Sequence, residues 1–174
     1  LAVTASSVVA TPSTKKADAA SYKAYLCLQT AKFTFRNQHD DAKFSNKLQN
    51  TTNKLSKNSA KFKDTTMKKG KKTYTVQLTG LNKCIAKDKT FNTLYVDTNI
   101  KGKDKKKVTV TNVNVFFDGK KVKTIKKGVL TPDPGQTDGF VQLQIINMWN
   151  SRVAKFKYTM PKKTIKVTYT VKIK

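Results

Sequence analysis

The side chains best suited to chemistry gather in one run, RNQHDD, at residues 36–41, which contains the only histidine and one of the two arginines. Glycoside hydrolysis needs two carboxylates placed across a cleft. Asp40 and Asp41 are adjacent, so on a strand they would point to opposite faces. All ten acidic residues are Asp, so no Glu can serve as the acid. This run does not predict a glycosidase.

Other catalytic and metal-dependent chemistries also lack the residues that they need. A Ser-His-Asp triad would have to use His39, and no serine lies in a GxSxG nucleophile elbow. There is no glycine-rich phosphate loop, no CxxC pair and no Cys/His spacing typical of zinc ligands. The pair Asp40–Asp41 is a weak signal for Ca²⁺. We therefore expect a protein that is not an enzyme and has no metal or cofactor.

Sugar binding asks for less, namely an exposed aromatic ring and a few planar polar groups around a concave site. Two stretches of the sequence offer both features, and the candidate ligand-binding residues in them are Phe33, Arg36, Asn37, His39, Asp40, Trp149 and Asn150. Arg152 and Asn147 lie beside the second group, so each arginine is close to an aromatic residue and an Asn. The structural alternative is that Trp149 packs in the core and Arg36 pairs with Asp40 or Asp41.

The elements that would position these residues are strands. The chain lacks Glu and is rich in Thr, Val, Asn and Lys, a composition that favours strands over helices. Tyr22 to Gln29 alternate between apolar and other residues, which predicts a half-buried strand with Ala24, Leu26 and Leu28 inward. Residues 33–36 predict a short second strand, and residues 42–67 a long lysine-rich loop.

Further strands are expected over 73–81, 91–100, 108–117, 120–125, 140–149 and 164–173. Residues 101–107 predict a turn, and Asp118-Gly119 is a strong hairpin signal. The phase of the strand over 108–117 shifts near Thr111-Asn112, as a β-bulge would cause. Together these patterns predict an all-β fold, a single antiparallel β-sandwich of jelly-roll or immunoglobulin-like kind with eight or nine strands over residues 21–174.

Residues 1–20 differ from the rest, with an apolar run that ends at Val8-Val9-Ala10 and small-x-small sequences that suit signal peptidase. We expect a truncated signal peptide and linker, and hence a secreted or cell-surface protein. The alternative is that Val3 to Val9 form an ordered strand, donated to a neighbouring subunit. The chain has no apolar stretch long enough for a transmembrane helix.

The net charge of +26 suggests attraction to polyanions. Thirty-four of the 36 basic residues are Lys and are dispersed along strands and loops, whereas nucleic-acid readers rely on Arg. Specific nucleic-acid recognition is therefore not expected, although anionic polymers remain candidate partners. Cys27 and Cys84 would suit either one disulfide or two buried thiols.

Three segments together resemble a known class of protein: AYLCLQTAKFTFRNQHDD, VQLQIINMWN and the closing IKVTYTVKI, with a DG hairpin between the first two. Over residues 22–174 the chain resembles the β-sandwich accessory modules, similar to carbohydrate-binding modules, of secreted and surface proteins of gut Firmicutes. The resemblance implies a non-catalytic module that binds a polysaccharide or a surface glycan. The alternatives are a structural subunit of a surface fibre and a cationic protein that adheres to polyanions.

Overall fold

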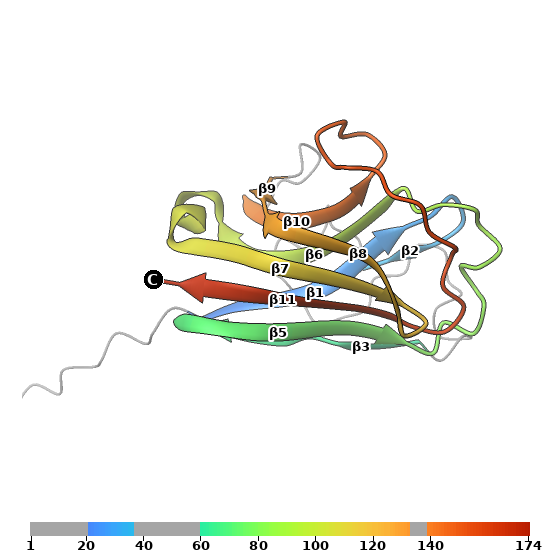
Figure 1. The fold of residues 1–174 in the computed structure, drawn as a ribbon, viewed down its shortest axis with the longest axis horizontal. Coiled ribbons are helices and arrows are strands. Elements are labelled where there is room, and N and C mark those ends of the chain that lie inside the picture. The colour runs from blue at the N-terminus through green and yellow to red at the C-terminus, as the bar shows by residue number, and fades with distance from the viewer. Residues whose placement is uncertain (1–20, 37–59, 133–138) are drawn as a thin grey trace, which may run out of the picture.

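The alternating apolar residues build two antiparallel sheets that pack face to face (Figure 1). The computed structural model describes residues 21–36, 60–132 and 139–174. Six strands form sheet A in the order β2-β1-β6-β10-β9, with β4 paired to β1: β1 (Ser21–Gln29), β2 (Thr34–Phe35), β4 (Thr65–Lys68), β6 (Thr93–Lys101), β9 (Leu130–Thr131) and β10 (Phe140–Asn147).

Sheet B has the order β3-β5-β11-β7-β8: β3 (Lys61–Lys63), β5 (Gly70–Thr79), β7 (Val108–Phe117), β8 (Lys120–Gly128) and β11 (Ile165–Ile173). A 3₁₀ helix, Gly102–Lys107, connects β6 to β7 where a turn was expected. The predicted all-β sandwich is confirmed. The structure has eleven strands rather than eight or nine because β3, β4 and β9, of two to four residues each, were not anticipated.

The hairpin between β7 and β8 forms where the sequence predicts it. Phe117 pairs with Lys120, and both residues between them have positive φ angles, 51° at Asp118 and 81° at Gly119. Positive φ at both central positions is the conformation that Asp-Gly favours. The bulge expected in β7 also forms, because Asn112 has a φ of 51° where the pairing of β7 with β11 shifts.

The first strand is not the half-buried strand that its alternation predicts. Ala24, Leu26 and Leu28 face the main core between the sheets. Tyr25 and Cys27, expected to point outward to solvent, are also fully buried, in a second cluster with Tyr95. The prediction failed because the period of two assigns residues to faces without showing whether the second face is covered.

The two cysteines are buried free thiols that belong to different clusters. Cys84 lies in the main core between the sheets, whereas Cys27 lies in the cluster on the other face of β1. Burial raises the pKa of the Cys84 thiol, despite hydrogen bonds to the backbone that lower it. The structure therefore favours the free-thiol interpretation over the disulfide.

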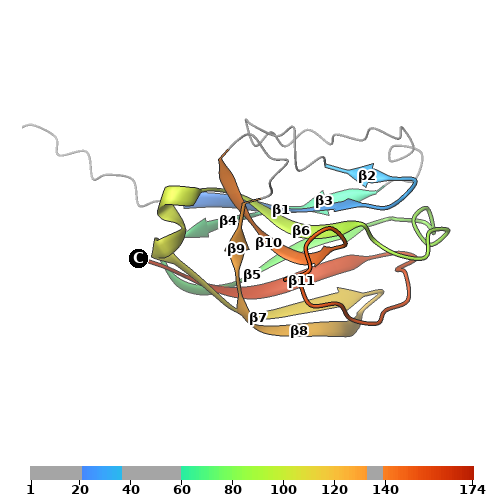
Figure 2. The same ribbon diagram turned by 90° about the horizontal axis from the view of Figure 1, so that it is seen from above.

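The chain changes from sheet B to sheet A between β8 and β9, close to one open side of the sandwich (Figure 2). A Cβ added at Gly128 would lie 2.9 Å from both Leu143 Cδ1 and Val110 Cγ1. Gly128 therefore allows the two sheets to approach each other where the chain crosses between them.

Several expectations fall on residues 1–20, 37–59 and 133–138, which lie outside the described residues. They include the signal peptide, the donated strand at Val3 to Val9, and most of the loop over 42–67. None of the helices among the described residues is long and apolar enough to cross a membrane. Within the same residues, no three His, Cys, Asp or Glu side chains come together as metal ligands would.

Candidate functional site

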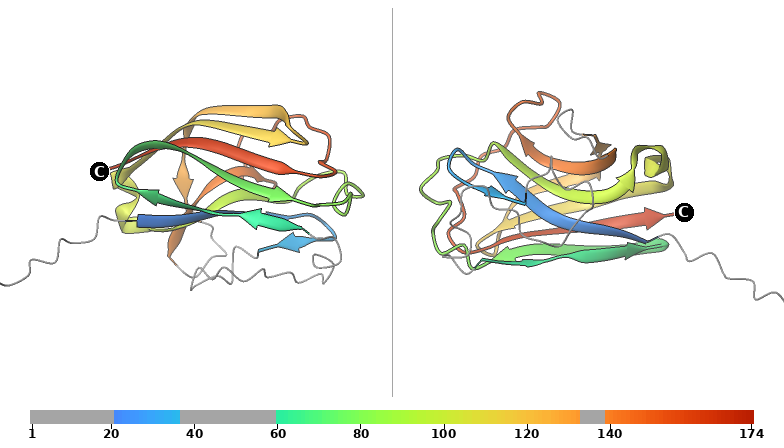
Figure 3. Two further views of the ribbon diagram at one scale, coloured as in Figure 1. Left: turned by 90° about the horizontal axis from the view of Figure 1, so that it is seen from below. Right: turned by 180° about the vertical axis from the view of Figure 1, so that it is seen from behind.

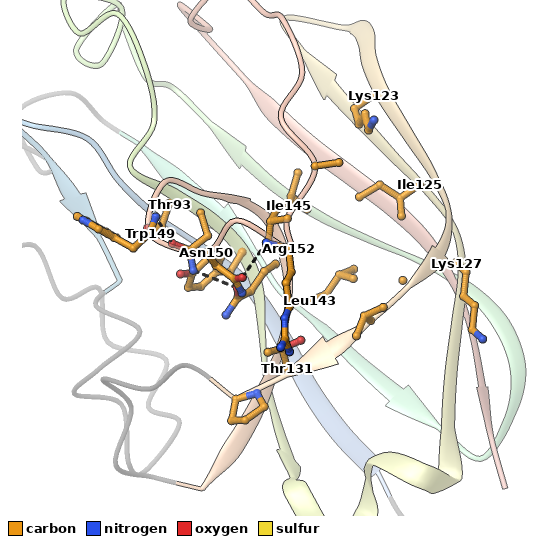
Figure 4. A pocket seen from close by; sticks show the side chains of 18 of the residues that line it. Thr93, Lys123, Ile125, Lys127, Thr131, Leu143, Ile145, Trp149, Asn150 and Arg152 are labelled. Carbon is orange, nitrogen blue, oxygen red and sulfur yellow. Dashed lines mark hydrogen bonds between the residues drawn. The ribbon is translucent and has the colours of Figure 1, made fainter.

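An open hollow of about 990 Å³ lies between the edge strand β8 of sheet B and strands β9 and β10 of sheet A (Figure 4). Its apolar lining includes Ile125 from β8, Leu143 and Ile145 from β10, and Val153 from the segment after β10. The hollow exists because β9 pairs only with Gln142 and Leu143, so the rest of β10 has no strand on that side among the described residues.

The segment Met148–Ala154 follows β10, and its residues from Trp149 onward form one wall of this hollow. Two short side-chain turns shape it: the Asn147 Oδ1 accepts from the Trp149 N–H at 3.0 Å, and the Asn150 Oδ1 accepts from the Arg152 N–H at 3.1 Å. Such Asx turns fix the backbone locally. The sequence N-x-W-N-x-R therefore sets the positions of the tryptophan and the arginine, each two residues after an Asn.

A single buried amide holds both asparagines. The Gln144 Oε1 accepts a hydrogen bond from Asn147 Nδ2 at 3.1 Å and another from Asn150 Nδ2 at 3.2 Å. Gln144 is itself only 7% exposed, and its Nε2 lies 3.4 Å from Gln142 Oε1. Since its oxygen is used by the segment itself, Gln144 acts as a support for the wall.

Trp149 is the most exposed aromatic side chain of the described residues. Its relative exposure is 65%, and it lines the hollow. The expected strand over 140–149 ends at Asn147, so Met148 and Trp149 leave the sheet and point to solvent, and the alternative of a core tryptophan is wrong. Val129, which is 66% exposed, also lines the hollow, and exposed apolar side chains that gather at one hollow suit a binding surface.

The charges around the hollow are all positive. Arg152 is exposed, and Lys123 and Lys127 from β8 also line the hollow, whereas no acidic residue does among the described residues. The Lys123 Nζ lies 5.7 Å from the centroid of the Phe156 ring. In Figure 4 the side chain of Lys127 points away from the other labelled residues.

One buried hydroxyl in the lining has no internal use. Thr93 is 1% exposed, and its Oγ1 has no hydrogen-bond partner among the described residues. A buried polar atom without a partner costs about 1–3 kcal/mol. Thr93 lies at the start of β6, opposite Asn147, close to the polar wall of the hollow.

The first candidate stretch has a different environment. Phe33 is 7% exposed and lies in the main core, stacked at 6.0 Å on Phe35. Arg36 is 5% exposed, and its Nη1 lies 2.6 Å from Asp64 Oδ1. Its guanidinium is 4.6 Å from the Tyr25 ring centroid and 4.5 Å from that of Phe62. In this arrangement neither Phe33 nor Arg36 offers a surface to a ligand.

The structure thus places the seven candidate residues in three groups. Trp149 and Asn150 lie together at the hollow, with Asn150 supporting the wall. Phe33 and Arg36 are buried near β1 and β3, and Asn37, His39 and Asp40 lie outside the described residues. Arg36 forms an ion pair with Asp64, a residue 28 positions away, whereas Asp40 and Asp41, the partners expected for it, lie outside the described residues.

The sequence did not point to Gln144, Thr93, Ile125 or Lys123 as parts of a site. They come from three strands that meet only because the edges of two sheets lie close together. The one sequence signal that could have indicated them is the pair of amides at positions 142 and 144, inside a strand that is otherwise apolar.

A second, smaller pocket of about 250 Å³ adjoins the same segment. It is lined by Met148, Phe156 and Tyr158, among others, and Val153 and Ala154 belong to both linings. Tyr158 is fixed there, because its hydroxyl accepts the Phe91 N–H at 2.9 Å. The segment Met148–Ala154 therefore borders two depressions.

No protein-family model matches this chain, and neither a curated protein nor a solved structure does.

Proposed function

We propose that this protein is a secreted or cell-surface, non-catalytic β-sandwich module that binds carbohydrate in the hollow between β8 and β10. The observation that carries the proposal is the exposed Trp149 ring on a wall fixed by Gln144, Asn147 and Asn150. Sugar rings present flat faces of C–H groups, which an indole covers well, and their hydroxyls need fixed polar partners.

The mechanism assigns a separate role to each group of side chains. Trp149 stacks on a sugar ring, and Arg152 donates hydrogen bonds to its hydroxyls at the mouth of the hollow. Gln144 and the two asparagines keep this pair in position before the ligand arrives, which reduces the entropy lost on binding. Thr93 Oγ1 and Gln142 Nε2 are buried groups with unused hydrogen-bonding capacity beside them.

Retardation in gels that contain neutral polysaccharides tests the proposal, because neutral polymers exclude simple attraction by the charge of +26. Trp149→Ala should abolish the retardation of the wild type, since a central aromatic anchor contributes about 2 kcal/mol or more. Met148→Ala is the matched control, because Met148 is an adjacent side chain that is 55% exposed but lines the other pocket.

Two outcomes would refute the proposal. If no neutral polysaccharide retards the wild-type protein, or if Met148→Ala weakens retention as much as Trp149→Ala, the hollow is not a carbohydrate site.

A further inference from the structure

The lysines of this protein are not evenly shared between its two sheets. The five strands of sheet B carry eleven lysines and no acidic residue, and β8 alone carries five of them. The six strands of sheet A carry three lysines and one aspartate. The even dispersal expected from the sequence is therefore wrong for the strands, because the fold gathers the charge on sheet B.

In sheet B the strands β5, β11, β7 and β8 lie side by side (Figure 3, left), so the side chains that point away from sheet A form rows across them. Lys71 on β5 lies directly opposite Lys172 on β11. The next row pairs Thr73 with Thr170, whose hydroxyls are 3.0 Å apart. The third row contains Thr75, Thr168, Asn114 and Thr124, in which the Thr124 hydroxyl donates to Asn114 Oδ1 at 2.9 Å.

The last row returns to positive charge. Lys166 pairs with Gln77 on one side and with Phe116 on the other, and Lys121 follows Phe116 on β8. The Lys166 Nζ lies 4.5 Å from the centroid of the Phe116 ring and so covers the aromatic side chain nearest to this row. Two lysine rows thus border a band of Thr and Asn, with Lys127 at its β8 end, and we call this surface the lysine–threonine face.

This face has an electrostatic cost that the fold does not explain. Like charges placed directly opposite each other on neighbouring strands destabilise a sheet. Lys71 and Lys172 stand in this relation, and no strand of sheet B contains an acid that would offset it. An anionic partner that lay against both rows would attract the lysines of each row and so offset the repulsion between them.

The chemistry of the face selects among anions. Arginine binds carboxylates and phosphates alike through its planar fork, whereas lysine acts as a point charge, which suits the separate phosphates of an extended polymer. The one aromatic ring in these rows, Phe116, is half-buried and lies under the Lys166 ammonium group, so bases of single-stranded nucleic acid would find no open ring to stack on. We infer that the lysine–threonine face binds an extended phosphodiester polymer without bases, in which phosphates meet the lysines and sugar or polyol hydroxyls meet the threonines.

Three lysines of the face and three elsewhere allow a charge-matched test. The face variant carries Lys71→Gln, Lys166→Gln and Lys172→Gln. The control carries Lys32→Gln, Lys87→Gln and Lys89→Gln, all exposed and outside sheet B. Binding to immobilised poly(glycerol phosphate) is measured by biolayer interferometry over a range of salt concentrations. Both variants lose three positive charges, so any difference between their affinities reports on where the lysines lie.

The face variant should bind about a hundredfold more weakly, given roughly fivefold per lysine at an anionic surface. The slope of log K against log salt is negative, and its magnitude should be smaller by about two to three in this variant, as three lost phosphate contacts imply. The control should change less than about threefold. Replacing the same three face lysines with Arg should retain binding, which separates loss of charge from damage to the face. Oligothymidylate and heparin serve as competitors and should displace the protein less well than free poly(glycerol phosphate).

Equal weakening of the face variant and the control would overturn the inference, and so would stronger competition by oligothymidylate or heparin. The inference does not rest on the carbohydrate site in the hollow. Trp149→Ala should leave poly(glycerol phosphate) binding unchanged, and the face variant should retain neutral polysaccharide, so either proposal can fail alone.

Discussion

The two arginines of this protein have similar sequence neighbours and opposite environments. Arg36 is 5% exposed, held between the rings of Tyr25 and Phe62 and paired with Asp64. Arg152 is exposed at the mouth of the hollow, in a segment fixed by amide side chains. The same combination of an aromatic residue, an arginine and an asparagine close together in the sequence therefore has two outcomes. It forms a structural clasp at Arg36 and a candidate binding wall at Arg152.

The difference lies in the elements that pack against each stretch. The clasp is closed by β3 and by Asp64, which come from a distant part of the chain. The wall at Arg152 faces an open side of the sandwich, where β9 is only two residues long. Burial thus converts one arginine into a stabilising element and leaves the other available to a ligand.

The largest expected effect comes from breaking the clasp. Asp64→Ala leaves the buried Arg36 without its carboxylate, and an uncompensated buried charge costs about 3 kcal/mol. Urea denaturation should show this loss in the free energy of unfolding, while Arg152→Ala should change it by less than about 0.5 kcal/mol. Equal stability of the two variants would contradict the contrast between the two arginines.

The next effect concerns the place where the sheets approach each other. Gly128→Ala puts a methyl group against Leu143 and Val110, and overpacking of this kind costs about 1–3 kcal/mol. The control is Gly102→Ala, whose added Cβ would meet only the Gly139 carbonyl oxygen at 3.8 Å. Thermal unfolding should separate them, and a Gly128→Ala variant as stable as the control would mean that the two sheets can move apart freely at this point.

A smaller effect is expected at the support of the wall. Gln144→Leu removes the oxygen that accepts from Asn147 and Asn150, at a cost of about 1 kcal/mol. The wall should then move more, which lowers the fluorescence anisotropy of Trp149 and weakens polysaccharide retention about tenfold. Unchanged anisotropy and retention would show that Gln144 does not position the tryptophan.

The smallest effect depends on pH and lies away from both arginines. The Asp118 carboxylate accepts from the backbone N–H groups of Lys162, Lys163 and Thr164 at 2.8, 2.7 and 3.0 Å. Partial burial acts to raise the pKa of Asp118, but these hydrogen bonds and the Lys163 charge outweigh it and lower the pKa below its ordinary value of 3.8.

A lowered pKa in the folded state means that this stabilisation is present above the unfolded pKa and is lost as the pH falls through the folded pKa. Asp118→Asn keeps a residue suited to the turn but removes the charge. The difference in melting temperature between wild type and this variant should therefore shrink below about pH 4. A difference that is constant from about pH 6 to about pH 2.5 would contradict the role of the carboxylate.

Local signals predicted much of the fold. The hairpin at Asp118-Gly119, the bulge near Asn112 and the inward side chains of β11 follow from backbone preference and alternation, which neighbouring residues decide. The double burial of β1 and the short strands β3 and β4 could not be predicted, because they depend on packing partners from far along the chain.

The candidate site was predicted in part for the same reason. Trp149 and Asn150 were identified from residue type and spacing alone, and they do line the hollow. Phe33 and Arg36 had equally suitable types, but Phe33 is buried in the main core and Arg36 is buried against Phe62 and Asp64, which no local pattern shows. The lysine–threonine face was missed because its rows combine the β7–β8 hairpin with β5 and β11, which lie far from it and from each other in the sequence.

Trp149 is the only tryptophan of the chain, so its intrinsic fluorescence tests the central claim directly. In the free protein the 65% exposed ring should emit at the long wavelength of an indole in water. Titration with a neutral polysaccharide that the protein retains should shift this emission to shorter wavelength with the same affinity as the retention. Retention without any change in the emission would show that the sugar binds elsewhere and that the hollow at Trp149 is not the site.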